Sequence, residues 1–427
     1  MIDSFRSPSR RAGGTRTQRA INALRHEGLL SLWWRVAKWR ASRRSGFARV
    51  PLDSVFHDDV IDVDWTIPRD FNSGVVSAPK NGYNIAWVIS PPSAASGGHV
   101  NAWRFMKFLE DAGHNLTLYF YSAPTFPRFS VDGIRRMLGI TTAYPALAAD
   151  MRMYSPDTGI EGDYHAVIAS DWATAYASYR YSGNAKRIYF VQDFEPVFYP
   201  AGSDYIVAEN SYRLGFHGIT VGPWLSQKLT RDFGMRADHY DYGVNSDLYR
   251  RTNDERRDDV IFYARPTTGR RATEFGLLVL EDFHRQRPEV TIHIAGWDMS
   301  SYDIPFPYVN HGPLDVRELS SLYNRCAAAL SISLSSASLF PFEVMSCGVQ
   351  PVINDADYTR VALNNNPHVI YVPLSPKVMS RALITALERP DQVENSRTIA
   401  ASFGDAGWKD SGVQFMEAFT RVMSGGK

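Results

Sequence analysis

Cysteine and long apolar runs are both scarce in this sequence. Only two of its 427 residues are cysteine, Cys326 and Cys347, and neither belongs to a CxxC pair. This scarcity argues against a disulfide framework or a zinc framework, and it favours a reducing compartment. No run approaches the roughly eighteen apolar residues that a membrane-spanning helix needs, and the polar, arginine-rich N-terminus is unlike a signal peptide. We therefore expect a cytoplasmic protein.

Several short motifs that mark well-known chemistry are also missing. The chain contains no GxSxG nucleophile elbow and no Walker A phosphate loop, and its glycine-containing loop after the first predicted strand is not GxGxxG. Two Asp-x-Asp pairs, Asp62 with Asp64 and Asp355 with Asp357, match a pattern that binds a divalent cation with a diphosphate. So short a pattern is very common by chance, and we assign no metal site.

What the sequence does contain is typical of a folded protein with more than one domain. Hydrophobic residues make up 44% of the chain and charged residues 21%, and aromatic residues reach 13%. The length suits two to three domains with sizeable cores. Tryptophan and tyrosine often line sugar or nucleoside sites by stacking, although most of them pack in cores.

The charge of the chain is divided unevenly. Residues 1–50 hold twelve basic and two acidic side chains, a net charge of +10, so the remainder carries −9 to reach the total of +1. A basic segment on an acidic body favours a polyanionic partner, either anionic lipid or nucleic acid. From Ile21 to Arg44, apolar residues recur at roughly helical spacing with tryptophan beside arginine, as in a helix at a membrane interface. We expect an anionic membrane surface rather than nucleic acid; alternatively, the helix packs on its own protein or on a second subunit of a homodimer.

The body of the chain alternates predicted strands and helices. After a loop-like connector over residues 51–82, the pattern predicts a strand at Asn84–Ile89 and a small-residue loop ending in Gly97–His99. A helix that buries Phe105 and a strand at Leu116–Phe120 follow. A strand, a glycine loop, a helix and a strand in this order open a doubly wound α/β domain. The glycines would let the backbone approach a ligand at the carboxyl edge of the sheet.

Acidic residues follow two further predicted strands. Asp171 comes just after one strand, and Asp193 and Glu195 come just after the next. In open α/β sheets, polar residues past the carboxyl end of a strand line the ligand site, and Phe194 beside them could stack on a sugar face. Each acid could instead be a helix N-cap or a loop residue, and this alternative applies more to Asp171 than to the Asp193–Glu195 pair.

The alternation restarts in the second half of the chain. A predicted strand at Asp259–Tyr263 leads to Arg265 and Arg270, and helices are predicted from Ala272 and around Val316–Tyr323. The first of these helices is expected to bury Phe275, Leu278, Val279 and Phe283. Arginines at a strand end, beside a helix N-terminus, can clamp a diphosphate. Surface arginines are usually solvated, but this topological position favours the clamp.

One strand–loop–helix unit is especially compact. Leu330, Ile332 and Leu334 predict a short buried strand, a serine-rich loop follows, and a helix is predicted between Pro341 and Gly348. Glu343 lies early in that helix and could accept hydrogen bonds from vicinal hydroxyls. An ordinary first-turn acid, favoured by the helix dipole, explains the position equally well on physical grounds.

These features resemble the GT-B glycosyltransferases, nearest the retaining family 4 and, within it, the rhamnosyltransferases of bacterial O-antigen and S-layer glycans. The resemblance covers about residues 80–425. The Asp-Phe-Glu-Pro-x-Phe-Tyr run is its most specific motif for the rhamnosyl subgroup, and the helix of Glu343 is its most specific motif for the superfamily. The residues that carry it are Gly97–His99, Val191–Pro200, Gly243–Asn245, Arg265 with Arg270, and Phe342–Gly348.

The resemblance implies an α/β architecture of two Rossmann-like, doubly wound domains that face each other across a cleft. A basic, tryptophan-containing segment would occupy residues 1–55. The acceptor-side domain would occupy residues 56–240 and the nucleotide-sugar domain residues 241–404. A helix at residues 405–427 would cross back to the first domain.

The resemblance also implies roles for individual residues. Arg265, Arg270 and Glu343 would be the catalytic residues: the arginines would neutralise the diphosphate leaving group in place of a metal, and Glu343 would hold the ribose. The donor site would comprise Gly97, Gly98, Arg265, Arg270, Ser335, Ser336, Leu339, Phe340 and Glu343. The acceptor site would comprise His99, Asp171, Asp193, Phe194 and Glu195.

The implied reaction transfers a sugar with retention, without metal or other cofactor, onto a lipid-linked cell-surface glycan at the inner face of the cell membrane. L-rhamnose from dTDP-L-rhamnose is the expected donor. One position departs from the family, whose Glu-x7-Glu pair would place a sugar-binding glutamate at Ser335. A deoxy sugar presents fewer polar groups, so serines and backbone N–H groups could suffice. Alternatively, the chain is a non-catalytic nucleotide-sugar- or glycan-binding member of an envelope polysaccharide assembly complex.

Overall fold

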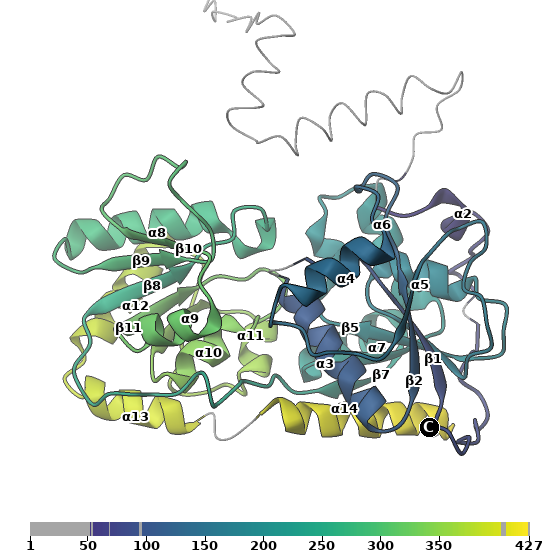
Figure 1. Ribbon diagram of the computed structural model, residues 1–427. Coiled ribbons are helices and arrows are strands. Elements are labelled where there is room, and N and C mark those ends of the chain that lie inside the picture. The colour runs from purple at the N-terminus through teal and green to yellow at the C-terminus, as the bar shows by residue number, and fades with distance from the viewer. Residues whose placement is uncertain (1–51, 53, 68, 94–95, 403–406, 426–427) are drawn as a thin grey trace, which may run out of the picture.

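The computed structural model describes residues 52, 54–67, 69–93, 96–402 and 407–425. The basic segment and the helix predicted from Ile21 to Arg44 lie outside these residues. The described chain forms two lobes, each built around a central sheet with helices on its faces (Figure 1).

The first lobe contains a sheet of seven parallel strands in the order β3-β2-β1-β4-β5-β6-β7. The strand order reverses between β1 and β4, and open α/β sheets bind ligands at the carboxyl edge beside such a reversal. The strands are β1 Asn84–Ile89, β2 Asn115–Phe120, β3 Asp150–Met153, β4 Ala166–Ala169, β5 Lys186–Val191, β6 His217–Val221 and β7 Arg236–Tyr240.

Helical segments connect these strands. Ser96 caps α3 through its hydroxyl, and α3 then buries Phe105, Met106 and Leu109 against the sheet. The helices are α2 His57–Val60, α3 Gly97–Asp111, α4 Val131–Gly139, α5 Trp172–Tyr179, α6 Ser203–Asn210 and α7 Pro223–Phe233, with 3-10 turns η1 Glu195–Phe198 and η2 Ser211–Arg213.

The second lobe contains six parallel strands in the order β10-β9-β8-β11-β12-β13, and its strand order reverses between β8 and β11. The strands are β8 Asp259–Tyr263, β9 Ile292–Ala295, β10 Val309–Gly312, β11 Cys326–Ser331, β12 Gln350–Asn354 and β13 Ile370–Val372. The helical segments are η3 Gly269–Arg271, α8 Thr273–Gln286, α9 Val316–Tyr323, α10 Phe340–Ser346, α11 Asp357–Ala362, α12 Pro376–Glu388 and α13 Gln392–Ser402.

The last helix, α14 (Trp408–Met423), follows the second lobe in sequence but packs on the first. Figure 1 shows it in yellow beneath α3 in the right-hand lobe. Phe415, Phe419 and Val422 are buried in the core of the first sheet. Gly412 permits the close approach, because a Cβ there would lie 2.4 Å from the ring of Phe108 on α3. This helix therefore joins the two lobes a second time.

The segment between the N-terminal residues and β1 is more than a connector. Val55 and Asp59 are buried, and the side chain of Asn72 makes two hydrogen bonds to the backbone of Arg187 in β5. The Lys186 Nζ donates to backbone carbonyls of the same segment, at Asn72 and Gly74. These contacts satisfy polar groups of a buried strand and make the segment part of the first domain.

Three local predictions were wrong. Leu334 lies beyond the end of β11 and is 41% exposed, because the buried strand uses the preceding small residues Cys326–Ser331 instead. Leu278 is 54% exposed, since the buried face of α8 runs through Val279, Leu280 and Phe283. Gly97 and Gly98 form the first turn of α3 rather than a loop.

Candidate functional site

The carboxyl edges of the two sheets meet at a cluster of three side chains from distant parts of the chain. Asp193 follows β5 in the first domain, Arg270 lies in η3 after β8, and Ser335 lies in the loop after β11. The Arg270 Nε donates to the Asp193 Oδ2 at 3.2 Å, and the Ser335 hydroxyl donates to the same oxygen at 3.0 Å. The cluster therefore lies where the strand order of the second sheet reverses, the position at which open α/β sheets bind ligands.

Arg270 is held from two sides by the first domain. Besides its ion pair with Asp193, its guanidinium carbon lies 3.8 Å from the ring centroid of Phe198 in η1. Its backbone carbonyl also accepts a hydrogen bond from the N–H of Leu334, which ties η3 to the serine-rich loop. Arg270 is thus a fixed cation at the domain interface.

Arg271 is the neighbouring cation, and sequence reasoning did not assign it to the site. Its Nη1 donates to the Ser333 hydroxyl at 2.5 Å. Burial lowers the pKa of Arg271, while the charge of Asp193 opposes that shift. Arg271 is half-buried and has no ion-pair partner among the described residues, so its charge can be satisfied by an anionic ligand.

Arg265 was predicted to stand with Arg270 but has a different setting. Its backbone N–H donates to the hydroxyl of Thr273, at the start of α8. Its guanidinium lies beside the ring of Tyr263 and donates to the Tyr263 hydroxyl at 3.4 Å. The charge of Arg265 acts on Arg271, so it belongs to the same positive region.

Glu343 lies in the first turn of α10 and retains partial exposure. Burial raises the pKa of Glu343 to about 7, and a hydrogen bond from Tyr323 and the charge of Arg104 partly oppose this. The Tyr323 hydroxyl lies 3.5 Å from the Glu343 Oε2. A carboxylate this poorly satisfied by its own protein can accept hydrogen bonds from a ligand.

Arg104 approaches Glu343 from the other domain and was also missed by sequence reasoning. It lies on α3, and its guanidinium carbon is 4.0 Å from the ring centroid of Trp408, the first residue of α14. Burial lowers the pKa of Arg104 to about 10, and the charge of Glu343 opposes the shift. The electrostatic setting of Glu343 therefore depends on the first domain.

The other predicted donor residues lie in the same strand–loop–helix unit. Ser336 is buried, Leu339 is the N-cap residue of α10, and Phe340 is buried. The ring of Phe340 stacks on Tyr263 with 5.6 Å between centroids and meets Tyr323 edge-on. Phe340 thereby links the helix of Glu343 to the strand that precedes the arginines.

The start of α3 reaches this cluster through Gln192, which precedes Asp193. The Gln192 side chain donates to the carbonyl of Gly98 at 3.0 Å and accepts from Asn101 at 3.0 Å. Nothing within 4 Å would meet a Cβ at Gly97, so this glycine faces open space. Gln192 is another residue that sequence reasoning left unassigned.

Two of the predicted acceptor residues come together at the reversal point of the first sheet. The His99 Nε2 lies 3.0 Å from the Ser90 carbonyl, and the His99 Nδ1 lies 2.6 Å from the Ser96 hydroxyl. Asp171 caps α5 in a reciprocal arrangement with Thr174. Burial raises the pKa of Asp171, and a hydrogen bond with Ser90 opposes the rise. The helix-cap alternative accounts for Asp171, and its acceptor role stays a prediction.

Phe194 and Glu195 turn into the core of the first domain. The Glu195 Oε2 accepts from the Trp172 N–H and from the Tyr189 hydroxyl, each at 2.7 Å. Burial raises the pKa of Glu195 well above its ordinary value. Phe194 is 7% exposed and stacks on Tyr212, so its ring is not offered to a sugar in this structure. The two residues support the loop that presents Asp193.

Two family models match the parts of the chain that carry these residues. Residues 162–222 match the WsaF N-terminal domain, and residues 258–384 match the WsaF C-terminal domain. The O-antigen biosynthesis protein RfbC of Myxococcus xanthus is 30% identical over 265 residues, which are 60% of this chain. The chain spans only about a fifth of that relative, 20% of its length.

Solved structures resemble the chain over both domains. TarM of S. aureus superposes with a TM-score of 0.61 at 9% identity, over 80% of this chain and 98% of TarM. HepE of Anabaena, in complex with UDP and glucose, gives 0.56 at 13% identity, over 79% and 99% of the two chains. Sucrose-phosphate synthase of Thermosynechococcus elongatus gives 0.57 at 12% identity, over 80% and 99%. This chain has the GT-B fold. The fold class predicted from the sequence is thereby confirmed.

Within this GT-B fold, one aspartate of each Asp-x-Asp pair has a structural partner. Asp64 accepts hydrogen bonds from Thr66, and Asp355 forms an ion pair with Arg360. Among the residues that the structure describes, no three His, Cys, Asp or Glu side chains form a group that could hold a metal ion.

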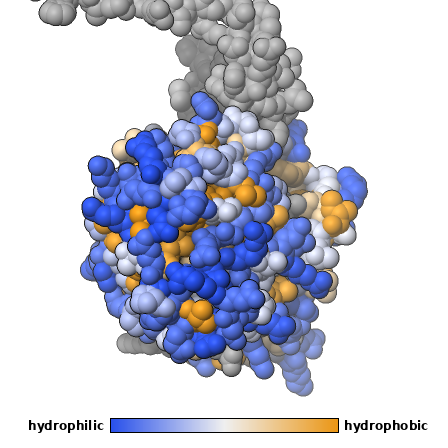
Figure 2. All heavy atoms as spheres, turned by 90° about the vertical axis from the view of Figure 1, so that its left-hand side faces the viewer, coloured by the Kyte–Doolittle hydropathy of each residue, from blue (hydrophilic) through white to orange (hydrophobic). Residues whose placement is uncertain are grey.

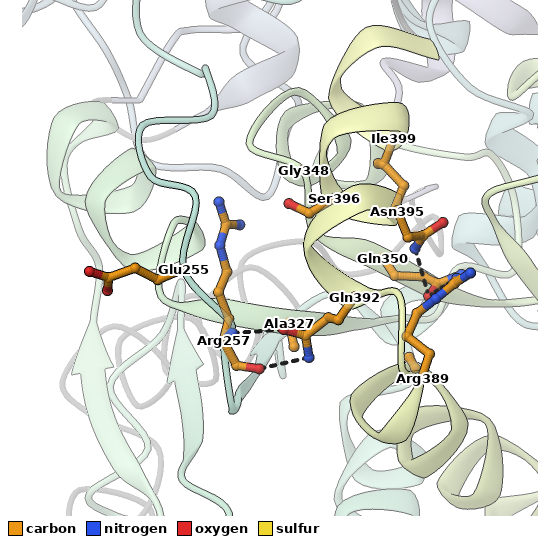
Figure 3. A pocket seen from close by; sticks show the side chains of 11 residues that line it. Glu255, Arg257, Ala327, Gly348, Gln350, Arg389, Gln392, Asn395, Ser396 and Ile399 are labelled. Atoms are coloured by element: carbon orange, nitrogen blue, oxygen red, sulfur yellow. Dashed lines mark hydrogen bonds between the residues drawn. The ribbon is translucent and has the colours of Figure 1, made fainter.

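A small pocket lies at the amino edge of the second sheet, opposite to the carboxyl edge that carries the arginines (Figure 3). Its polar side chains are largely paired with one another or with backbone. Gln392 bonds to the backbone N–H and carbonyl of Arg257, while Asn395 and Arg389 donate to Gln350. These hydrogen bonds join α13 to the sheet.

The outer face of the second lobe lies away from the cluster of Asp193, Arg270 and Ser335. Figure 2 shows a mainly hydrophilic surface on which apolar residues occur in small groups. None of the helices in the described part of the chain is long and apolar enough to cross a membrane.

Proposed function

We propose that the chain is a glycosyltransferase that moves a sugar from a nucleoside-diphosphate donor onto a cell-surface glycan. The observation that carries this proposal is the arginine pair Arg270–Arg271 at the reversal point of the second sheet, with Glu343 at the start of the adjacent helix. The matches to the WsaF domains and to an O-antigen biosynthesis protein support the same conclusion. The structural relatives include HepE in complex with UDP and glucose.

The arrangement supplies what departure of a nucleoside diphosphate needs. Negative charge grows on the diphosphate as its bond to the sugar breaks, and Arg270 and Arg271 are already in place to stabilise it. Fixed cations cost no reorganisation at the moment of reaction, so they favour the transition state over the bound donor. The two arginines would take the part that a metal ion takes elsewhere, and Arg265 would add to the local positive field.

Glu343 would bind the ribose of the donor. Its ionised carboxylate can accept hydrogen bonds from two vicinal hydroxyls, and the N-terminal position on α10 favours the charged form. Bound hydroxyls would stabilise a carboxylate that burial otherwise disfavours. Ser335 and Ser336 would face the sugar, where short hydroxyls suit a deoxyhexose.

The finer assignment is transfer of L-rhamnose from dTDP-L-rhamnose with retention, onto a lipid-linked glycan. The residues around Asp193, which carry the resemblance to rhamnosyltransferases, and the serines in place of a second glutamate support this donor. Residues 1–50, with their net charge of +10, would hold the enzyme at an anionic membrane surface.

The test is release of nucleoside diphosphate from a panel of donors that includes dTDP-L-rhamnose and UDP-glucose, with rhamnosylated and lipid-linked acceptors. We expect nucleoside diphosphate release only when the correct donor and the correct acceptor are both present. EDTA should not affect this release, and Arg271→Ala and Glu343→Ala should abolish it. Proton NMR of the product reports whether the anomeric configuration is retained. Tight donor binding without turnover across all acceptors would instead identify a non-catalytic binding protein.

A further inference from the structure

Asp193 belongs to the first domain, but its side chain serves the second. Its Oδ2 accepts from Arg270 and from Ser335, and its Oδ1 accepts from the backbone N–H of Phe194 at 2.9 Å. Only about 10% of the side chain is exposed. Three of the roughly four acceptor positions of a carboxylate are therefore occupied. Little capacity remains for an acceptor hydroxyl.

The contact to Arg270 uses one specific edge of the guanidinium. Asp193 accepts from Nε, and the ring of Phe198 covers one face. Among the described residues, none accepts a hydrogen bond from Nη1 or Nη2 of Arg270. A guanidinium carries five N–H groups, so about four remain available on the two terminal nitrogens. That fork is the part of arginine that binds two phosphate oxygens at once.

We propose that Asp193 is a positioning residue for the nucleotide diphosphate: it fixes Arg270 through Nε so that the two terminal nitrogens bind phosphate oxygens. This inference rests on the proposed function. It differs from the acceptor-binding role that the sequence suggested for Asp193. An arginine held in this way loses less side-chain freedom when the ligand binds, so more of the interaction energy appears as affinity.

The same contact couples the anion site to the arrangement of the two domains. Asp193 and Arg270 are 77 residues apart and belong to different sheets, and Asp193 and Ser335 are 142 residues apart. Any movement that separates the domains breaks both bonds and frees the arginine to rotate. The diphosphate site is therefore complete only in the arrangement of domains seen here.

Two other roles for Asp193 predict different results. A carboxylate that merely competes with the ligand for Arg270 would weaken binding, so its removal would tighten it. A carboxylate that binds the acceptor would leave nucleotide affinity unchanged and would affect only the acceptor KM. A positioning residue lowers nucleotide affinity when removed, and only while Arg270 is present.

The experiment is isothermal titration calorimetry of the full chain with dTDP and with UDP. We expect Asp193→Ala to raise the Kd of the bound nucleotide about tenfold, as loss of an outer-shell orienting group does elsewhere. Asp193→Asn, which keeps an acceptor oxygen for Arg270 and Ser335, should lose less nucleotide affinity. In an Arg270→Ala background, Asp193→Ala should cause no further loss.

Asp150→Asn is the matched control, because Asp150 also accepts from an arginine Nε, that of Arg152, on the edge strand β3. Its nucleotide affinity should equal that of the wild type. Unchanged or tighter binding in Asp193→Ala overturns the proposal, as does an equal loss in the Arg270→Ala background. If Asp193→Ala fails to fold, Asp193→Asn is measured instead, alone and in the Arg270→Ala background. The proposal then requires that Asp193→Asn lowers nucleotide affinity only while Arg270 is present. A wild type that binds neither nucleotide overturns the proposed function itself, whereas the other adverse results leave that function standing.

Discussion

The two domains use the carboxyl edges of their sheets in opposite ways. In the first domain, His99, Asp171 and Glu195 make their hydrogen bonds within their own domain, and burial raises the pKa of both acids. In the second domain, Arg270 and Arg271 keep donors available and have no acid of their own sheet as an ion-pair partner among the described residues. The same topological edge thus forms a hydrogen-bonded scaffold in one domain and a positively charged surface in the other. A position just past a strand end does not by itself decide a role.

Removing a cation from the second-domain edge should have the largest effect. We expect Arg271→Ala to lower the rate of nucleoside diphosphate release about 10²- to 10³-fold, because a fixed charge that stabilises the leaving group is lost. Arg271→Lys should recover little, since lysine cannot bond to Ser333 and present a fork to phosphate together. The measurement is a coupled assay of dTDP release from dTDP-L-rhamnose. Arg397→Ala, a surface arginine paired with Asp254, is the control. A normal rate in Arg271→Ala would place the phosphate site elsewhere and remove the contrast between the domains.

Removing an acid from the first-domain edge should act on stability. Glu195→Ala leaves the Trp172 N–H and the Tyr189 hydroxyl buried without their acceptor, and we expect the free energy of unfolding to fall by about 3 kcal/mol. Burial raises the pKa of Glu195 and so disfavours its charge, and Glu195→Gln keeps an acceptor oxygen for both donors, so it should cost less than about 1 kcal/mol. Urea unfolding at pH 7 measures both. Equal losses of unfolding free energy in the two variants would show that a neutral acceptor does not replace the carboxyl group, and the contrast between the two edges would then fail.

Replacing Glu343 at the second-domain edge should have a smaller effect, namely a change in stability that depends on pH. Its pKa of about 7 in the folded protein lies above the ordinary value of 4.5, so the folded state binds the proton more tightly than the unfolded state. The wild type therefore loses stability as pH rises from about 4.5 to 7, whereas Glu343→Gln lacks this loss. We expect the variant to gain on the order of 1–2 kcal/mol over the wild type between pH 5 and pH 8.

Thermal unfolding at several pH values checks this, with a difference in Tm of about 2–4 °C expected. The control is Glu417→Gln, an exposed glutamate on α14, whose curve should run parallel to that of the wild type. Parallel curves for Glu343→Gln as well would show that Arg104 and Tyr323 already satisfy the carboxylate. In that case Glu343 would resemble the satisfied acids of the first domain.

The fold was largely predictable because its central elements carry strong local signals. The strand at Asp259–Tyr263 and the helix at Val316–Tyr323 have the predicted bounds. The edge strands β3, β7 and β10 were missed, since half-exposed strands with polar residues such as Asp150 and Arg236 lack a continuous apolar run. Strand β13 was missed as well, because it has only three residues.

The sequence by itself determined the α/β alternation and the positions of Arg270 and Glu343 at the edge of a second sheet, because strand and helix periods and strand ends are local properties. It did not determine which acid after β5 faces the partner domain. Asp193 meets Arg270 while Glu195, two residues on, turns into the core, and packing of the surrounding loop makes that choice. Only the tertiary structure brings together groups 77 and 142 residues apart, because such contacts depend on how two complete domains dock and not on any local pattern.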